Sequence, residues 1–78
     1  MEKAVFEFSG ALKRNFRETR LEIEFEPPKT IEEILLELDY AQQDLTYLVF
    51  FQNRERVPAD TSIQDGDLIK VIPPIGGG

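Results

Sequence analysis

Residues 21–38, LEIEFEPPKTIEEILLEL, contain the change of pattern that decides the fold. In the first part, Leu21, Ile23 and Phe25 alternate with glutamates. This period of two predicts a β-strand with one apolar face and one charged face. The prolines at positions 27–28 end the strand, because proline cannot donate a ladder hydrogen bond.

A helix is predicted to begin directly after these prolines. Thr30 and Glu33 have the spacing of a capping box, in which each side chain satisfies a backbone N–H at the start of the helix. The apolar residues that follow recur at helical spacing, which predicts one stripe that faces a core. They are Ile31, Ile34, Leu35 and Leu38. We expect the helix to end between Asp39 and Gln43.

Further strands flank this unit on both sides. Alternation predicts a strand over residues 4–8, and the apolar run at residues 45–51 predicts a strand interior to a sheet. Residues 53–56 are interpreted as a polar turn, and residues 57–58 allow only a short edge segment. The last strand is predicted at residues 68–72.

The order of these elements predicts an α+β fold, a mixed sheet with one main helix on one face. The first two strands are joined by a loop and should be antiparallel. The helix then acts as a crossover, which should place the last strand beside the first. Asp65-Gly66-Asp67 is predicted to be a tight turn, with glycine at the positive-φ position, and Ile63 to anchor the loop before it.

The composition excludes several classes of function. The 78 residues include no Cys and no His, so thiol chemistry, disulfides and the usual neutral-pH base are absent. The net charge of −6 argues against nucleic acid, whose phosphates need a basic surface. No apolar run approaches the about 20 residues of a membrane span, and no signal peptide is evident. We expect a cytoplasmic protein that binds no metal, nucleic acid or membrane.

Two charged segments are interpreted as solvated surface. The glutamates of residues 21–26 resemble an acid/base pair or a cation site only in spacing, since alternate strand residues share a face in any case. The loop at residues 11–19 is rich in Lys and Arg, with Leu12 and Phe16 expected to pack on the core. We expect this loop to contact an acidic patch on a protein partner rather than nucleic acid.

The sequence ends in PPIGGG, residues 73–78. Two prolines should stop the last strand, and glycines without Cβ atoms can thread a slot too narrow for other residues. Such a tail suits the delivery of a terminal carboxylate into the active site of a partner. Taken alone, it is more typical of a disordered terminus.

The element order, the Asp65–Asp67 turn and the terminal glycines together resemble the β-grasp ubiquitin-like sulfur carriers. Residues 6–8 and 11–14 also resemble the opening strand and loop of that family. The family includes the small subunit of molybdopterin synthase and the sulfur carrier of thiamine synthesis. The resemblance implies a β-grasp domain over residues 1–74 and a flexible glycine tail over residues 75–78.

The resemblance also implies a function without catalytic side chains, as a protein co-substrate and not as an enzyme on its own. An activating enzyme would use ATP to adenylate the carboxylate of Gly78, and a sulfur donor would convert it to a thiocarboxylate. Gly76 and Gly77 would thread the tail into that enzyme. The chain itself would bind no cofactor.

The pathway stays open at this point. Pro73-Pro74-Ile75 resembles the molybdopterin type, which would add the large subunit of molybdopterin synthase as a partner. Gly76 departs from that type, where another small residue is frequent. Carriers for thiamine, cysteine or tRNA thiolation share the ending, as do ubiquitin-like covalent modifiers, and a non-covalent scaffold is the third alternative.

We expect the partner to bind the sheet face opposite the helix, together with Pro74 and Ile75. The last strand should contribute Leu68, Lys70 and Ile72. The third strand should contribute either Leu48 and Phe50, or Tyr47, Val49 and Phe51, because a register slip of one residue exchanges the two faces. Phe50 is the candidate from the first set.

Overall fold

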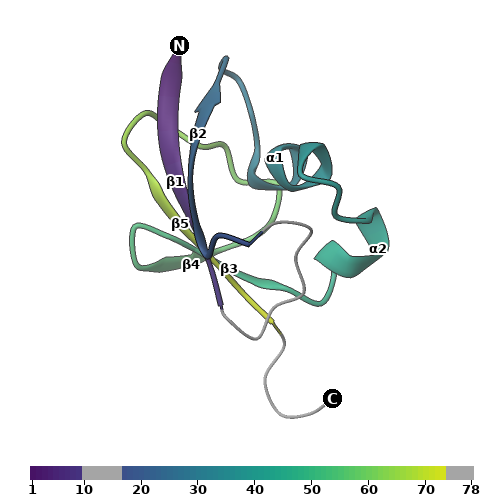
Figure 1. The fold of residues 1–78 in the computed structure, drawn as a ribbon. Coiled ribbons are helices and arrows are strands. Elements are labelled where there is room, and N and C mark those ends of the chain that lie inside the picture. The colour runs from purple at the N-terminus through teal and green to yellow at the C-terminus, as the bar shows by residue number, and fades with distance from the viewer. Residues whose placement is uncertain (10–16, 74–78) are drawn as a thin grey trace.

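The computed structural model of the chain describes residues 1–9 and 17–73. A five-stranded sheet forms one layer, and two short helices pack on one of its faces (Figure 1). The elements are β1 Glu2–Phe8, β2 Arg20–Phe25, α1 Ile31–Glu37, α2 Gln42–Leu45, β3 Val49–Gln52, β4 Glu55–Val57 and β5 Leu68–Ile72. The predicted α+β class is confirmed.

The strand order is β2-β1-β5-β3-β4. β1 and β2 are antiparallel, while β1 and β5 are parallel neighbours. The antiparallel pair and the position of the last strand beside the first were predicted, from the loop and from the crossover helix. β5 therefore lies in the centre of the sheet, with β1 on one side and the antiparallel β3 on the other.

The start of α1 follows the predicted capping box. Glu33 N donates to Thr30 Oγ1 at 3.2 Å, and Thr30 N donates to Glu33 Oε1 at 3.0 Å. The helix ends at Glu37, before the predicted range. Asp39 has a φ of 70°, and Tyr40 N donates to Leu35 O at 3.1 Å, which is the wrapped C-terminus of a Schellman motif.

Two predicted boundaries are wrong. Leu45 belongs to α2, and Thr46 and Tyr47 form a turn, so β3 starts only at Val49. A short apolar run does not distinguish a strand from a buried helical turn.

The second wrong boundary is the polar turn predicted at residues 53–56. The turn after β3 is only Asn53-Arg54, and charged Glu55 and Arg56 belong to the edge strand β4.

The core lies between the sheet and the helices. It contains the alternate residues of β1 and β5 together with the apolar stripe of α1. Its buried residues are Ala4, Phe6, Phe8, Phe25, Ile31, Ile34, Leu35, Leu45, Phe50, Ile63, Ile69 and Val71. The role of Ile63 as a loop anchor is confirmed. Within residues 1–9 and 17–73, no helix has the length and apolar composition needed to cross a membrane.

The turn before β5 is held by a buried carboxylate. Gly66 has a φ of 86°, as predicted for this turn. Asp67 is 7% exposed and accepts hydrogen bonds from Gln52 Nε2 at 2.8 Å, Asn53 Nδ2 at 2.9 Å and Gln64 N at 2.8 Å. These bonds fix the β3–β4 hairpin to the start of β5.

Candidate functional site: the open sheet face below the tail

The end of β5 is the base of the C-terminal tail. β5 ends at Ile72, and Pro73 follows it as a partly buried residue. Pro74, Ile75 and the three glycines up to Gly78 lie outside the described residues, so their assigned roles stay predictions. The described part of the candidate site is the sheet surface next to this exit point.

β5 presents Leu68, Lys70 and Ile72 on the sheet face opposite the helices. Ile69 and Val71 are fully buried under the helices, so the alternate residues face the other way. Lys70 is exposed, and the two aliphatic neighbours are partly buried. The predicted placement of these three residues on the open face is confirmed.

The third strand contributes Val49 and Phe51 to this face, and the placement of Phe50 on it is wrong. Phe50 is 3% exposed and belongs to the core. Val49 pairs with Ile72, and Phe51 pairs with Lys70. The register, which the sequence left open, is set by core packing of Phe50 opposite Val71.

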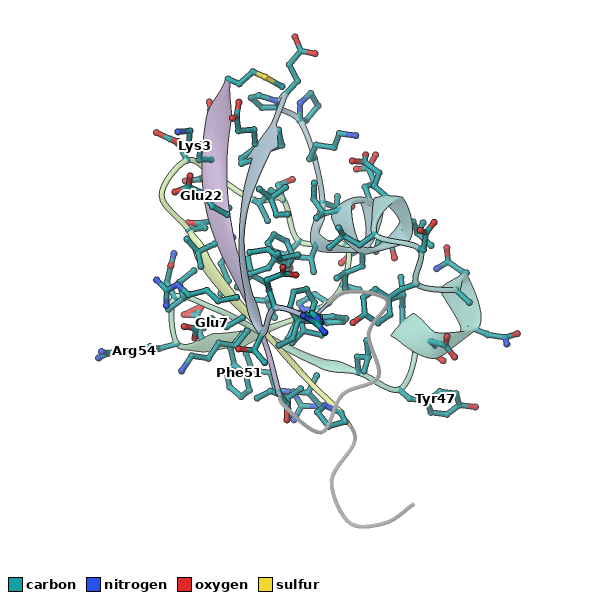
Figure 2. The ribbon with its side chains drawn as sticks, in the orientation of Figure 1. Lys3, Glu7, Glu22, Tyr47, Phe51 and Arg54 are labelled. Atoms are coloured by element: carbon teal, nitrogen blue, oxygen red, sulfur yellow. The ribbon has the colours of Figure 1, made fainter. Side chains whose placement is uncertain are left out.

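Leu48 and Tyr47 precede the strand, so strand alternation does not place them. Leu48 packs against the core, whereas Tyr47 is 69% exposed in the turn after α2. Figure 2 shows Tyr47 projecting into solvent from this turn. Tyr47 therefore lies beside the open face and not on it.

Sequence reasoning missed the contribution of β1 to the open face. Val5 pairs with Leu68, and Glu7 pairs with Lys70. Figure 2 shows Lys3, Glu7, Glu22 and Phe51 on the side of the sheet away from the helices. The alternation of residues 4–8 held this signal, because residues between buried Phe6 and Phe8 must face outward.

Charged residues surround an apolar centre on this face. Arg20 Nη1 donates to Glu7 Oε2 at 2.5 Å, and Lys3 Nζ lies 3.8 Å from Glu22 Oε1. In the described part of the chain, Lys70 forms no ion pair. An unpaired cation among Val49, Phe51 and Ile72 is available to an acidic group of a partner.

A shallow hollow of about 290 Å³ adjoins the base of the tail. It lies where the parallel strands β1 and β5 end. Its described lining residues are Glu7, Phe8, Ser9, Lys70, Val71 and Ile72. The hollow offers a partner a mixed polar and apolar contact directly beside the exit of the tail.

The acidic side chains of the described residues do not form a metal-binding cluster. Among residues 1–9 and 17–73, no three acidic side chains are grouped closely enough to hold a metal ion. Glu22, Glu24 and Glu26 are exposed along and after β2, as a solvated edge should be. Far from this face, the hydrogen bond from Lys29 to Glu37 raises the pKa of Lys29 above its ordinary value. This surface can bind a partner and position the tail.

The basic loop is only partly described. Lys13, Arg14, Leu12 and Phe16 lie outside the described residues, so the predicted packing of this loop is not tested. Arg17 and Arg20 are exposed, and Arg20 belongs to the ion pair with Glu7.

Known proteins of similar structure share this fold at low sequence identity. SAMP1 from Haloferax volcanii matches with a TM-score of 0.72 and 11% identity, over 97% of this chain and 99% of that chain. A chain from the complex of subunits 1 and 2 of molybdopterin-converting factor from Helicobacter pylori matches with a TM-score of 0.64 and 22% identity, over 97% of this chain and 99% of that chain. A putative molybdopterin-converting factor subunit 1 from Pyrococcus furiosus matches with a TM-score of 0.67 and 16% identity, over 96% of this chain and 100% of that chain.

The sequence itself matches a known family, although no curated protein sequence matches the chain significantly. The match covers residues 10–78 and is to the ThiS family. It includes β2 to β5, both helices and the terminal glycines. The protein therefore belongs to the ThiS family and is a ubiquitin-like sulfur carrier with the β-grasp fold.

Proposed function

We propose that the chain carries sulfur as a thiocarboxylate on Gly78 and that it serves as the small subunit of molybdopterin synthase. The carboxylate of Gly78 would attack the α-phosphate of ATP in an activating enzyme, releasing pyrophosphate. A sulfur donor would then displace AMP from the acyl adenylate. One oxygen of the carboxylate is thereby exchanged for sulfur.

The position of β5 is the observation that carries this proposal. The strand that leads to the tail is the central strand, paired on both sides and backed by buried Ile69 and Val71. A tail that leaves from such a strand has a fixed origin relative to the open face. A partner that binds this face would receive the tail in a defined direction.

The molybdopterin assignment rests on the tail sequence and on two structural relatives. Pro73-Pro74-Ile75 resembles the molybdopterin type. Both relatives are described as parts of molybdopterin-converting factor, one of them in a complex of its two subunits. By analogy, we propose that a large subunit binds the open face and accepts the tail.

The decisive experiment is the intact mass of the protein after incubation with its activating enzyme, ATP and sulfide. We first expect a mass that corresponds to a chain ending at Gly78. After the reaction, the mass should rise by the difference between sulfur and oxygen. A variant without Gly78 should stay unmodified and folded. An unchanged mass of the full chain, with an activating enzyme shown to be active, would refute the proposal.

Further experiments distinguish the molybdopterin pathway from other sulfur-transfer pathways, and sulfur transfer from conjugation to lysines. Mixing the thiocarboxylated chain with a molybdopterin synthase large subunit and its pterin substrate should return the original mass as sulfur is transferred. Retention of the sulfur there, with transfer in a thiamine or tRNA system, would replace the molybdopterin role. Isopeptide products between Gly78 and lysines would instead support a covalent modifier.

A further inference from the structure

The β4 edge of the sheet has features that the sulfur-carrier function does not use. β4 is the last strand in the order β2-β1-β5-β3-β4, so one of its sides has no strand neighbour in the described structure. Unpaired strand edges can accept an additional strand from another chain. The other edge strand, β2, carries exposed Glu22 and Glu24.

The register of β3 shows which backbone groups face this free edge. Asn53 N donates to Leu68 O at 2.8 Å, so Asn53, Phe51 and Val49 direct their backbone groups toward β5. Gln52 and Phe50 then direct theirs toward β4, where they pair with Glu55 and Val57. Arg56 lies between these two paired residues, so its N–H and C=O point away from β3.

An open groove of about 480 Å³ lies at the end of β4, between the β3–β4 strands and the segment that follows α2. Most of its lining residues are apolar, with Arg56 and Thr46 as the polar side chains, while polar and apolar atoms share its surface almost equally. The lining residues are Leu45, Thr46, Leu48, Val49, Phe50, Arg56, Val57, Pro58 and Ala59. Aliphatic side chains of a bound segment would be desolvated in this groove.

Residues 54–57 carry a net positive charge, opposite to that of the whole chain, because Arg54 and Arg56 flank a single acidic residue, the exposed Glu55. Arg54 and Arg56 are both exposed, and neither forms an ion pair with any other described residue. Figure 2 shows Arg54 extending from the β3–β4 hairpin away from the body. In a chain of net charge −6, unpaired Arg56 on β4 and unpaired Arg54 in the adjoining turn favour an acidic ligand.

We propose that the β4 edge binds an extended segment of a partner protein in which aliphatic and acidic residues alternate. The segment would pair with the backbone of Arg56. Residues of an added strand point alternately to the two faces of the sheet, so its aliphatic side chains would enter the groove while a carboxylate meets the Arg56 guanidinium. This site is separate from the tail and does not depend on the proposed sulfur chemistry.

The test uses the full chain labelled with nitrogen-15 and a synthetic peptide, Glu-Leu-Glu-Ile-Glu-Leu-Glu. The comparison peptide has the same composition, with its leucines and isoleucine consecutive. We expect saturable amide shifts from the alternating peptide, largest at Arg56 and at the groove residues. The comparison peptide should bind roughly tenfold more weakly, because it cannot fill the groove and meet the arginine together.

Matched variants separate charge from backbone pairing. Arg56→Glu should weaken binding roughly tenfold. Lys3→Glu changes the net charge equally but lies three strands away on β1, so it should leave the affinity unchanged. Arg56→Ala removes the guanidinium alone, and Arg56→Pro removes the outward N–H as well, a loss that an edge strand tolerates. Arg56→Pro should therefore weaken binding more than Arg56→Ala.

Several outcomes would overturn the proposal. The proposal would be wrong if the two peptides bound with equal affinity, or if the largest amide shifts lay away from β4. It would also be wrong if Lys3→Glu weakened binding as much as Arg56→Glu. Dimers of the peptide-free chain that Arg56→Glu dissociates would assign the edge to a second copy instead.

Discussion

Asp67 is the buried charged residue of the described chain, and it joins three segments. Its two carboxylate oxygens accept hydrogen bonds from the side chains of Gln52 and Asn53 and from the backbone N–H of Gln64. Asn53 in turn accepts from Leu68 N at 2.8 Å through Oδ1. A carboxylate suits this position because every contact it makes is with a donor.

We predict that Asp67→Ala lowers the free energy of unfolding by about 2 kcal/mol, since partly buried amide donors would lose their acceptor. Urea unfolding of the variant measures this loss. Asp65→Ala is the matched control, because Asp65 is exposed and accepts one bond, from Lys3 N at 2.9 Å. An Asp67→Ala protein as stable as the control would contradict the role of the carboxylate.

The β3–β4 hairpin is the element whose turn sequence fits its backbone least well. Asn53 and Arg54 have φ values of 50° and 77°, and a two-residue turn with both φ values positive is type I′. Asparagine tolerates the first position, but glycine is preferred at the second. Arg54 therefore holds a backbone conformation that disfavours its side chain.

We predict that Arg54→Gly raises the free energy of unfolding by about 0.5 kcal/mol, because glycine relieves this conformation at some cost in chain entropy. Thermal and urea unfolding measure the change. Glu55→Gly is the matched control within β4, where glycine should destabilise. A lower stability of Arg54→Gly would show that the arginine makes a contribution that outweighs the strain.

The elements differ in how well the sequence predicts them. Alternation predicts β1 and β2, an apolar segment between a tight turn and two prolines predicts β5, and a cap and an apolar stripe predict α1, because each of these signals is local. The boundary between α2 and β3 was missed. Leu45 is a buried residue of a helix and Phe50 is a buried residue of a strand, and both belong to the same apolar run of the sequence. Only packing against the rest of the core distinguishes the two.

At the scale of the whole molecule, the two faces of the sheet have separate roles. One is covered by helices and forms the core, and the other presents Val49, Phe51 and Ile72 around Lys70. The sequence predicted such a face but could not decide between Phe50 and Phe51, because that choice depends on register. The predicted roles of Gly76 to Gly78 come from family resemblance and await measurement.

If the proposed function holds, Phe51→Glu should reduce kcat/KM for thiocarboxylation roughly tenfold, mainly through a higher KM. A charge in place of an aromatic ring disrupts binding and leaves the tail intact. Leu36→Glu is the matched control, since Leu36 is 39% exposed on α1 in the opposite layer. Equal rates for the Phe51 and Leu36 variants would show that the activating enzyme does not use the open face.

The parallel pairing of β1 with β5 also has a mechanical consequence. Because these strands run in the same direction, Met1 and Ile72 lie at opposite ends of the sheet (Figure 1). A force between the N-terminus and the tail would load the hydrogen bonds of β1 and β5 in shear, all together instead of one after another. The domain should therefore resist a pull on its tail, as would occur when the tail is drawn out of a tight channel.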